Sequence, residues 1–200
     1  MNNKGFTLVE LIGSMVILGL LMLVVVPNVV GLMQSNRQTV YIEDAKKLVN
    51  IAKSKVSMHK ISTLADNQCA FLGLGYLDNS EFDSPPNGGC YDVNSSFVIV
   101  KKNGTTHEYE YYVQLAEFYE NRYNGILEPT NIKNITKDTI KENEMLTGDN
   151  RIDYTKNDPA SVATNPPTPP AICASISASN VFNKNGPKSY DTNGEGMCAK

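Results

Sequence analysis

The chain has 200 residues, of which 41% are hydrophobic and 20% charged, and its formal net charge is −3. This length fits one domain, or a small domain with an additional segment, and so small a net charge does not indicate a nucleic-acid-binding protein. The charge is unevenly distributed. Residues 1–60 contain seven Lys or Arg and three Asp or Glu, whereas residues 61–200 contain 11 basic and 18 acidic residues. Two parts this different argue against an ordinary soluble globular enzyme.

The N-terminal part contains a long apolar segment. Between Phe6 and Met33 the only charged side chain is that of Glu10, and about 20 apolar residues suffice for a helix to cross the hydrocarbon layer of a membrane. A cleaved secretory signal has a shorter apolar stretch and a small-residue cleavage site after it, which this sequence lacks. A single-span anchor fits the length but leaves Glu10 unexplained.

Glu10 is the most informative residue of this segment. A carboxylate at the centre of a membrane helix costs roughly 2.5–3.5 kcal/mol on insertion scales, and less near the interface, where the carboxylate reaches water. Glu10 is therefore either an acid at the membrane edge or a group that awaits a positively charged partner.

The string Lys4-Gly5-Phe6-Thr7-Leu8-Val9-Glu10 resembles the class III signal of prepilins. That family comprises type IV pilins, the pseudopilins of type II secretion systems and competence pilins. In it a short basic leader ends in Gly, a membrane aspartyl prepilin peptidase cuts after that Gly, the new first residue is N-methylated, and the fifth mature residue is Glu. Gly5, Phe6 and Glu10 match these roles, and Pro27 lies where many family helices have a kink-forming proline. The resemblance covers residues 1 to about 60.

The resemblance implies a role for Glu10 in assembly. Cleavage between Gly5 and Phe6 frees an α-amine, methylation of Phe6 keeps that amine positive, and an ammonium attracts a carboxylate strongly in a low dielectric. By the family's logic, the amine of an entering subunit meets Glu10 of a neighbour. The implied partners are prepilin peptidase, other pilin subunits, an inner-membrane assembly platform and, before assembly, membrane lipid. The implied location is the cytoplasmic membrane, with the N-terminus inside and the head outside, and then a surface filament.

Beyond Met33 the pattern becomes amphipathic. Apolar residues recur at helical spacing, namely Val40, Ala45, Leu48, Val49, Ala52, Val56 and Ile61. We therefore expect one helix from Phe6 to about Lys60, with one face of its second half packed on a folded domain. A helix of this length would span about 80 Å.

The remaining residues predict a small β-sheet. Residues 97–100 and 109–115 have strand character, and Asn103-Gly104 between them is a strong hairpin signal. We expect Tyr109, Tyr111, Val113 and Leu115 to face the helix, and a third strand near residues 132–140. Residues 69–90 are rich in turn residues, and residues 158–171 hold five of the ten prolines and predict an extended segment.

The predicted fold class is α+β, with a long N-terminal α-helix packed on a small antiparallel sheet, as in pilins. The expected divisions are a leader (1–5), a transmembrane or filament-core helix (6–33), its amphipathic continuation (34–61) and an extracytoplasmic head (62–200).

Four cysteines in a chain with an export signal indicate disulfides. Three pairings are possible, and we favour Cys69–Cys90 and Cys173–Cys198 because each closes a local, turn-rich loop. The second also resembles the C-terminal disulfide loop of many type IV pilins. Four reduced thiols fit only a cytosolic head. We expect no metal site, because the chain has no C-x-x-C and His59 and His107 lack ligand-like spacing, and we expect no cofactor.

No catalytic constellation or phosphate loop stands out, so we expect no enzyme. The lysines at residues 46–60 suit DNA phosphates, anionic lipid or the acidic head of a neighbour. We favour solvation and intersubunit pairing, and nucleic-acid binding is not supported. The leading prediction is a pilin, major or minor, that polymerises into a type IV pilus and supports adhesion, motility or surface attachment. Alternatives are a pseudopilin of a type II secretion or competence system, and a membrane-anchored extracellular binding module that never polymerises.

Overall fold

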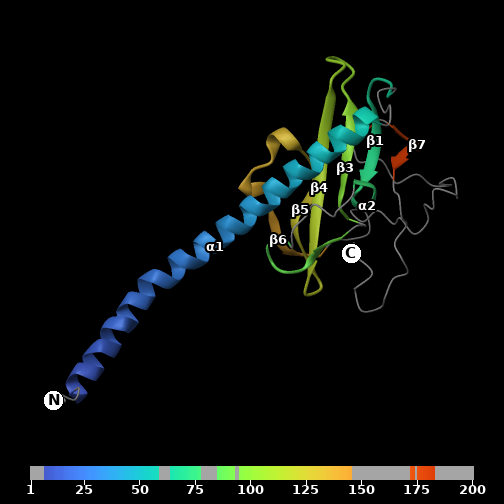
Figure 1. Ribbon diagram of the computed structural model, residues 1–200. Helices are drawn as coiled ribbons and strands as arrows, with labels where there is room; N and C mark the ends of the chain where they lie inside the picture. The colour runs from blue at the N-terminus through green and yellow to red at the C-terminus, as the bar shows by residue number, and fades with distance from the viewer. Residues whose placement is uncertain are drawn as a thin grey trace. The chain divides into compact units, whose positions relative to one another are not determined.

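The structure, a computed structural model, describes residues 7–58, 64–77, 85–92, 95–145, 172–173 and 175–182, the last of these by its backbone. One α-helix, α1, runs from Leu8 to Met58 and continues through Pro27 (Figure 1). This confirms the predicted long helix, although Phe6, Lys60 and Ile61 lie outside the described residues. The chain forms two compact units, residues 1–37 and 38–200, and α1 contributes to both.

In the first unit α1 is apolar and uncovered. Its large apolar side chains are exposed from Leu8 to Met33, and the helix is long and apolar enough to cross a membrane. The predicted kink at Pro27 remains a prediction.

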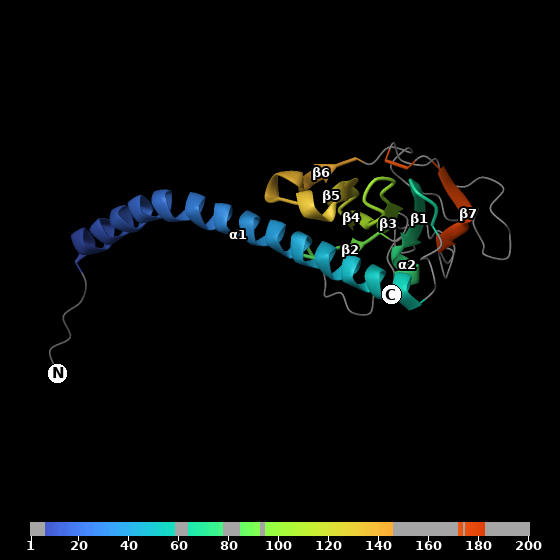
Figure 2. The ribbon, with the colours of Figure 1, turned by 90° about the horizontal axis from the view of Figure 1, so that it is seen from above.

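The second unit is a sheet with residues 38–58 of α1 against one of its faces (Figure 2). The strand order is β6-β5-β4-β3-β1-β7, with β2 paired to β4. β7 runs parallel to β1, and the other pairs are antiparallel. The predicted α+β class is therefore confirmed. The strands are β1 (Gln68–Gly73), β2 (Cys90–Tyr91), β3 (Phe97–Lys102), β4 (Tyr109–Tyr119), β5 (Arg122–Asn131), β6 (Lys141–Glu144) and β7 (Ser175–Phe182).

The main core lies between α1 and this sheet. The helix buries residues at the predicted spacing, and the strands bury alternate residues toward them, as the pleat requires. Val40 is exposed, contrary to expectation, and Tyr41 begins the buried stripe instead. Tyr109 and Tyr111 pack partly buried against this core, as predicted. The core includes Tyr41, Ala45, Leu48, Val49, Ala52 and Val56 of α1 and Leu72, Val98, Val100, Val113 and Leu115 of the strands.

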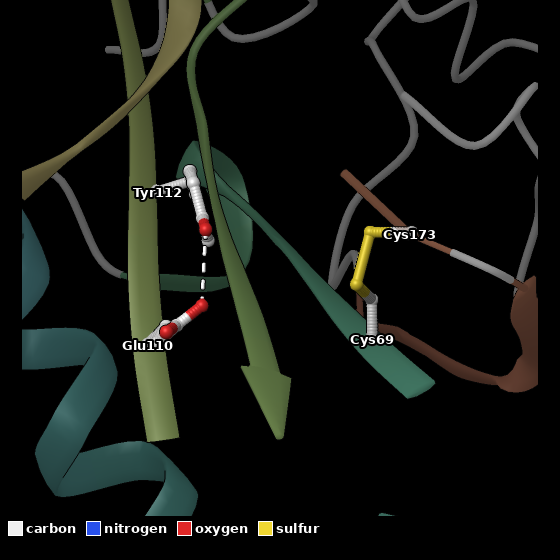
Figure 3. The surroundings of a disulfide bond; sticks show 4 residues. All are labelled: Cys69, Glu110, Tyr112 and Cys173. Atoms are coloured by element: carbon white, nitrogen blue, oxygen red, sulfur yellow. Dashed lines mark hydrogen bonds between the residues drawn. A yellow bond between two sulfur atoms is a disulfide. The ribbon is translucent and has the colours of Figure 1, made fainter. Parts of the chain in front are cut away.

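A disulfide joins Cys69 to Cys173 on the other face of the sheet (Figure 3). Both predicted pairings, Cys69–Cys90 and Cys173–Cys198, are therefore wrong. Because β7 pairs with β1, the chain just before β7 lies beside Cys69, and the two Cα atoms are 5.8 Å apart. Cys90 lies opposite Phe118 of β4, and β3 separates β4 from β1. Cys90 is also disulfide-bonded, and Cys198 lies outside the described residues.

The predicted third strand near residues 132–140 is wrong. No strand covers residues 132–140, which instead form two 3-10 turns, η3 (Ile132–Asn134) and η4 (Lys137–Thr139). Asn131 Oδ1 accepts a hydrogen bond from the Lys133 N–H, and the Thr139 hydroxyl donates to the Thr136 carbonyl. Such side-chain bonds favour turns over a strand ladder. The strand lies earlier, as β5.

Two other segments differ in detail from the prediction. The turn-rich stretch before Cys90 contains β1 and a short helix, α2 (Leu74–Leu77). The hairpin at Asn103-Gly104 is confirmed, but its connection spans residues 103–108, and the residue with positive φ is His107. The proline-rich segment 158–171 lies outside the described residues.

Candidate functional site

The first turn of α1 is closed by the side chains of Thr7 and Glu10. The Thr7 N–H and hydroxyl donate to Glu10 Oε2 at 2.9 and 2.8 Å, and the Glu10 N–H donates to Thr7 Oγ1 at 3.3 Å. This reciprocal arrangement is a capping box, which satisfies amide groups that a helix N-terminus otherwise leaves unpaired. The carboxylate also lies at the positive end of the helix dipole.

The capping box gives Glu10 a partner inside its own chain, which sequence reasoning missed. The Thr-x-x-Glu spacing at the start of an apolar run is the sequence pattern that predicts such a capping box. Gly5 and Phe6 lie outside the described residues. Cleavage between them would place the new α-amine next to Thr7, so that a positive charge would adjoin the residue that now holds Glu10.

A second constellation joins α1 to the sheet at Glu117, which is fully buried in β4. The Tyr41 hydroxyl donates to Glu117 Oε2. The Asn87 side chain donates to the same oxygen at 2.8 Å, and the Asn87 and Gly89 amides donate to Oε1 at 3.2 and 3.0 Å. Several donors compensate a buried carboxylate. The cluster therefore fixes the loop before β2 against α1.

The Tyr41 side chain has a raised pKa and a tightly packed ring in this cluster. Burial raises the pKa of its hydroxyl above the ordinary value of 10.0, and hydrogen bonding to Glu117 raises that pKa further. Its ring lies close to the backbone of β5 because Gly125, at φ +115°, has no side chain. A Cβ there would lie 3.3 Å from the Tyr41 ring and 2.4 Å from the Leu115 carbonyl oxygen.

Two more buried carboxylates have similar partners. The Tyr91 hydroxyl donates to Asp44 of α1, and burial followed by this bond raises the pKa of Tyr91. Asp92, fully buried, accepts from the Ser95 hydroxyl at 2.7 Å and from the Tyr123 hydroxyl at 3.3 Å. These carboxylates accept hydrogen bonds from hydroxyl groups of other segments and so connect parts of the fold. Their role is to stabilise the head. Within the described ranges, no group of three or more His, Cys, Asp or Glu residues is placed to hold a metal ion.

Comparison with known proteins identifies the N-terminal segment. Residues 1–26 match the family model of the prokaryotic N-terminal methylation motif. This motif is the class III signal segment of type IV pilins and pseudopilins. The match spans Gly5, Phe6 and Glu10. Comparisons with curated proteins and with solved structures find no match. By this N-terminal segment the chain is similar to the prepilins of type IV pilins and pseudopilins, and its fold, in which a long apolar helix packs on a small sheet, is pilin-like.

Proposed function

We propose that the protein is a structural subunit, not an enzyme, and that its mature form, beginning at methylated Phe6, polymerises into a type IV pilus. The observation that carries this proposal is the uncovered apolar half of α1, most of which lies within the methylation motif matched at residues 1–26. Lipid covers these side chains before assembly, and neighbouring helices cover them afterwards. In this scheme residues 1–5 are the leader, residues 6–33 form the filament core, residues 34–61 continue the helix and residues 62–200 form the external head.

The Thr7–Glu10 arrangement suggests how Glu10 acts in two states. Before assembly the carboxylate is held by its own helix start. During assembly it turns to the methylated amine of an incoming subunit, an ion pair that is worth more than a neutral contact in a dry environment. An uncompensated carboxylate in the filament core would oppose assembly, so pairing also sets the depth of the incoming subunit.

The first experiment identifies the mature N-terminus. Filaments sheared from cells that express the full-length protein and an active prepilin peptidase are analysed by mass spectrometry. We expect abundant protein that begins with methylated Phe6. An intact Met1 in such cells contradicts the proposal and favours a membrane-anchored binding module that never polymerises.

The second experiment separates the two roles of Glu10. Glu10→Ala should abolish or strongly reduce filaments while leaving the processed protein in the membrane. Thr7→Val is the matched control, since it removes the hydroxyl of the capping box but keeps the carboxylate. We expect this variant to assemble close to the wild-type level. Equal loss in both variants means that Glu10 serves only as a helix cap, and wild-type assembly of Glu10→Ala excludes any role for it.

A pseudopilin is the second candidate, because the methylation motif is common to both classes. The disulfide-bonded head supports the pilin. Abundant surface filaments at natural expression favour a pilus, whereas loss of protein secretion on deletion, without surface filaments, favours a pseudopilin.

A further inference from the structure

Four lysines lie on the part of α1 that packs on the sheet, namely Lys46, Lys47, Lys53 and Lys55. Lys46 and Lys53 are two helical turns apart and therefore lie on one side of the helix, and we call these two the lysine face. Lys46, Lys47 and Lys53 are exposed, and the Nζ atoms of Lys53 and Lys55 lie 5.4 and 5.6 Å from the ring centroids of Tyr111 and Tyr76. Within the described part of the chain, neither Lys46 nor Lys53 takes part in an ion pair. The helix therefore presents positive charge to its surroundings.

Carboxylates gather at one end of the sheet. Glu120 lies in the β4–β5 turn, and Glu142 and Glu144 lie in β6. The register places Glu144 opposite Tyr123, just beyond that turn, so these residues share one end of the sheet, which we call the acidic end. Arg122, the first residue of β5, is the basic residue next to this turn. Glu142 Oε1 is buried without a hydrogen-bond partner among the described residues, so the negative charge here is incompletely compensated.

Lys53 lies too far from Glu120 for these two charges to neutralise each other within one chain. Lys53 lies over Tyr111, and Glu120 is nine residue steps further along β4 and its turn. At a strand rise of 3.4 Å per residue this separation is about 30 Å. A positive surface and a negative surface at different places on one molecule suit a head-to-tail contact between copies, and such contacts generate open filaments when they do not close into a ring.

We propose that the lysine face of one chain binds the acidic end of a second copy of this chain. The inference rests on the proposed function and deepens it by naming the two surfaces through which neighbouring heads meet. Charge complementarity favours a second copy of the chain as the partner of the lysine face. Residues 61–200 carry 18 acidic and 11 basic residues and so offer the opposite charge. Exposed ion pairs are individually weak, but every subunit of a filament repeats them, and like charges in the same places would oppose the contact.

Charge reversal tests the proposal in the full-length protein, with filament yield measured after shearing. The double variant Lys46→Glu/Lys53→Glu should lower the yield about ten-fold, because reversal converts attraction into repulsion. Adding Glu120→Lys and Glu144→Lys should restore most of it. Lys133→Glu/Lys137→Glu reverses two lysines elsewhere on the head and should leave the yield unchanged. Wild-type yield for the first variant, or failure of the compensating changes to rescue it, overturns the proposal.

Cross-linking gives a second readout that does not depend on variants. A carbodiimide joins lysine amines directly to carboxylates that touch them. In wild-type filaments assembled from isotope-labelled and unlabelled subunits, we expect mixed-isotope cross-links from Lys46 or Lys53 to Glu120 or Glu144. Cross-links of these lysines to other sites overturn the proposal.

The same measurements distinguish this inference from the proposed function. Normal filaments from the reversed variant, together with lost binding to duplex DNA or anionic vesicles, assign the lysine face to that other partner and overturn the inference alone. Absence of filaments from processed wild-type protein overturns the proposed function itself.

Discussion

Replacing Tyr41 by Phe should destabilise the head by about 2 kcal/mol. The change removes one hydroxyl and keeps the ring, whose packing beside Gly125 is retained. The hydroxyl donates to the fully buried carboxylate of Glu117, and a hydrogen bond to a charged group contributes about 1.5–3 kcal/mol. Glu117 keeps its bonds from Asn87 and Gly89, so the cost stays below that of an unpaired buried charge.

Equilibrium unfolding in urea measures this cost. The full-length protein in mild detergent is followed by the near-ultraviolet circular dichroism of its ten tyrosines, since the chain has no tryptophan. Tyr111→Phe is the matched control, because that hydroxyl makes no hydrogen bond among the described residues, and it should cost less than about 0.5 kcal/mol. Glu117→Gln should cost at least as much as Tyr41→Phe, because one acceptor oxygen becomes a donor that faces other donors. Equal stability of the Tyr41 and Tyr111 variants would refute this reasoning.

Two further predictions concern the tyrosines and the cysteines. Because burial and then the facing carboxylates raise the pKa values of Tyr41 and Tyr91 above 10.0, the folded head binds these protons more tightly than the unfolded chain. Stability present below pH 10 should therefore be lost as the pH rises above it. In a titration at 295 nm the two hydroxyls should ionise only with unfolding, and titration of all ten near pH 10 in a native head contradicts this. Peptide mapping without reduction should find Cys69 joined to Cys173 and Cys90 to Cys198, and Cys69→Ala/Cys173→Ala should cost about 4–5 kcal/mol, as expected for a closed loop of roughly 100 residues. A Cys69–Cys90 peptide would exclude this pairing.

The sequence predicts those parts of the fold whose signal is local. Helical spacing identified the buried stripe of α1 from Ala45 to Val56 because each of those positions is apolar. It missed Tyr41 and Asp44, which are buried because distant residues supply their partners. The Tyr41 hydroxyl meets a carboxylate 76 residues further along the chain, and no window of neighbouring residues contains that pairing.

The disulfide was missed for the same reason. Local loop closure favoured Cys69–Cys90, but β7 lies parallel to β1, and this places residues 104 positions apart side by side. The predicted third strand was placed near residues 132–140, and β5 (Arg122–Asn131) was not predicted; its interior contains Gly125 and Pro129, residue types that weaken a strand pattern. In the fold Gly125 admits the Tyr41 ring. The same distinction applies to the candidate sites. The methylation motif is contiguous and could be recognised in the sequence, whereas the residues of the Glu117 cluster come from α1, the loop before β2 and β4 and could not be.

The two parts of α1 bear on how a proposed filament would choose its subunits. Residues 38–58 bury their apolar face within the chain, whereas the apolar side chains of residues 8–33 remain uncovered. Lipid tails and neighbouring helices are about equally apolar, so moving this segment from one to the other changes little hydrophobic free energy. In the proposed filament the polar groups would change their surroundings, because Glu10 would leave its cap for an amine and the lysine face would meet carboxylates. In such a filament the selection of the partner would rest on these few charged groups, and variants in them should alter assembly while leaving membrane insertion intact.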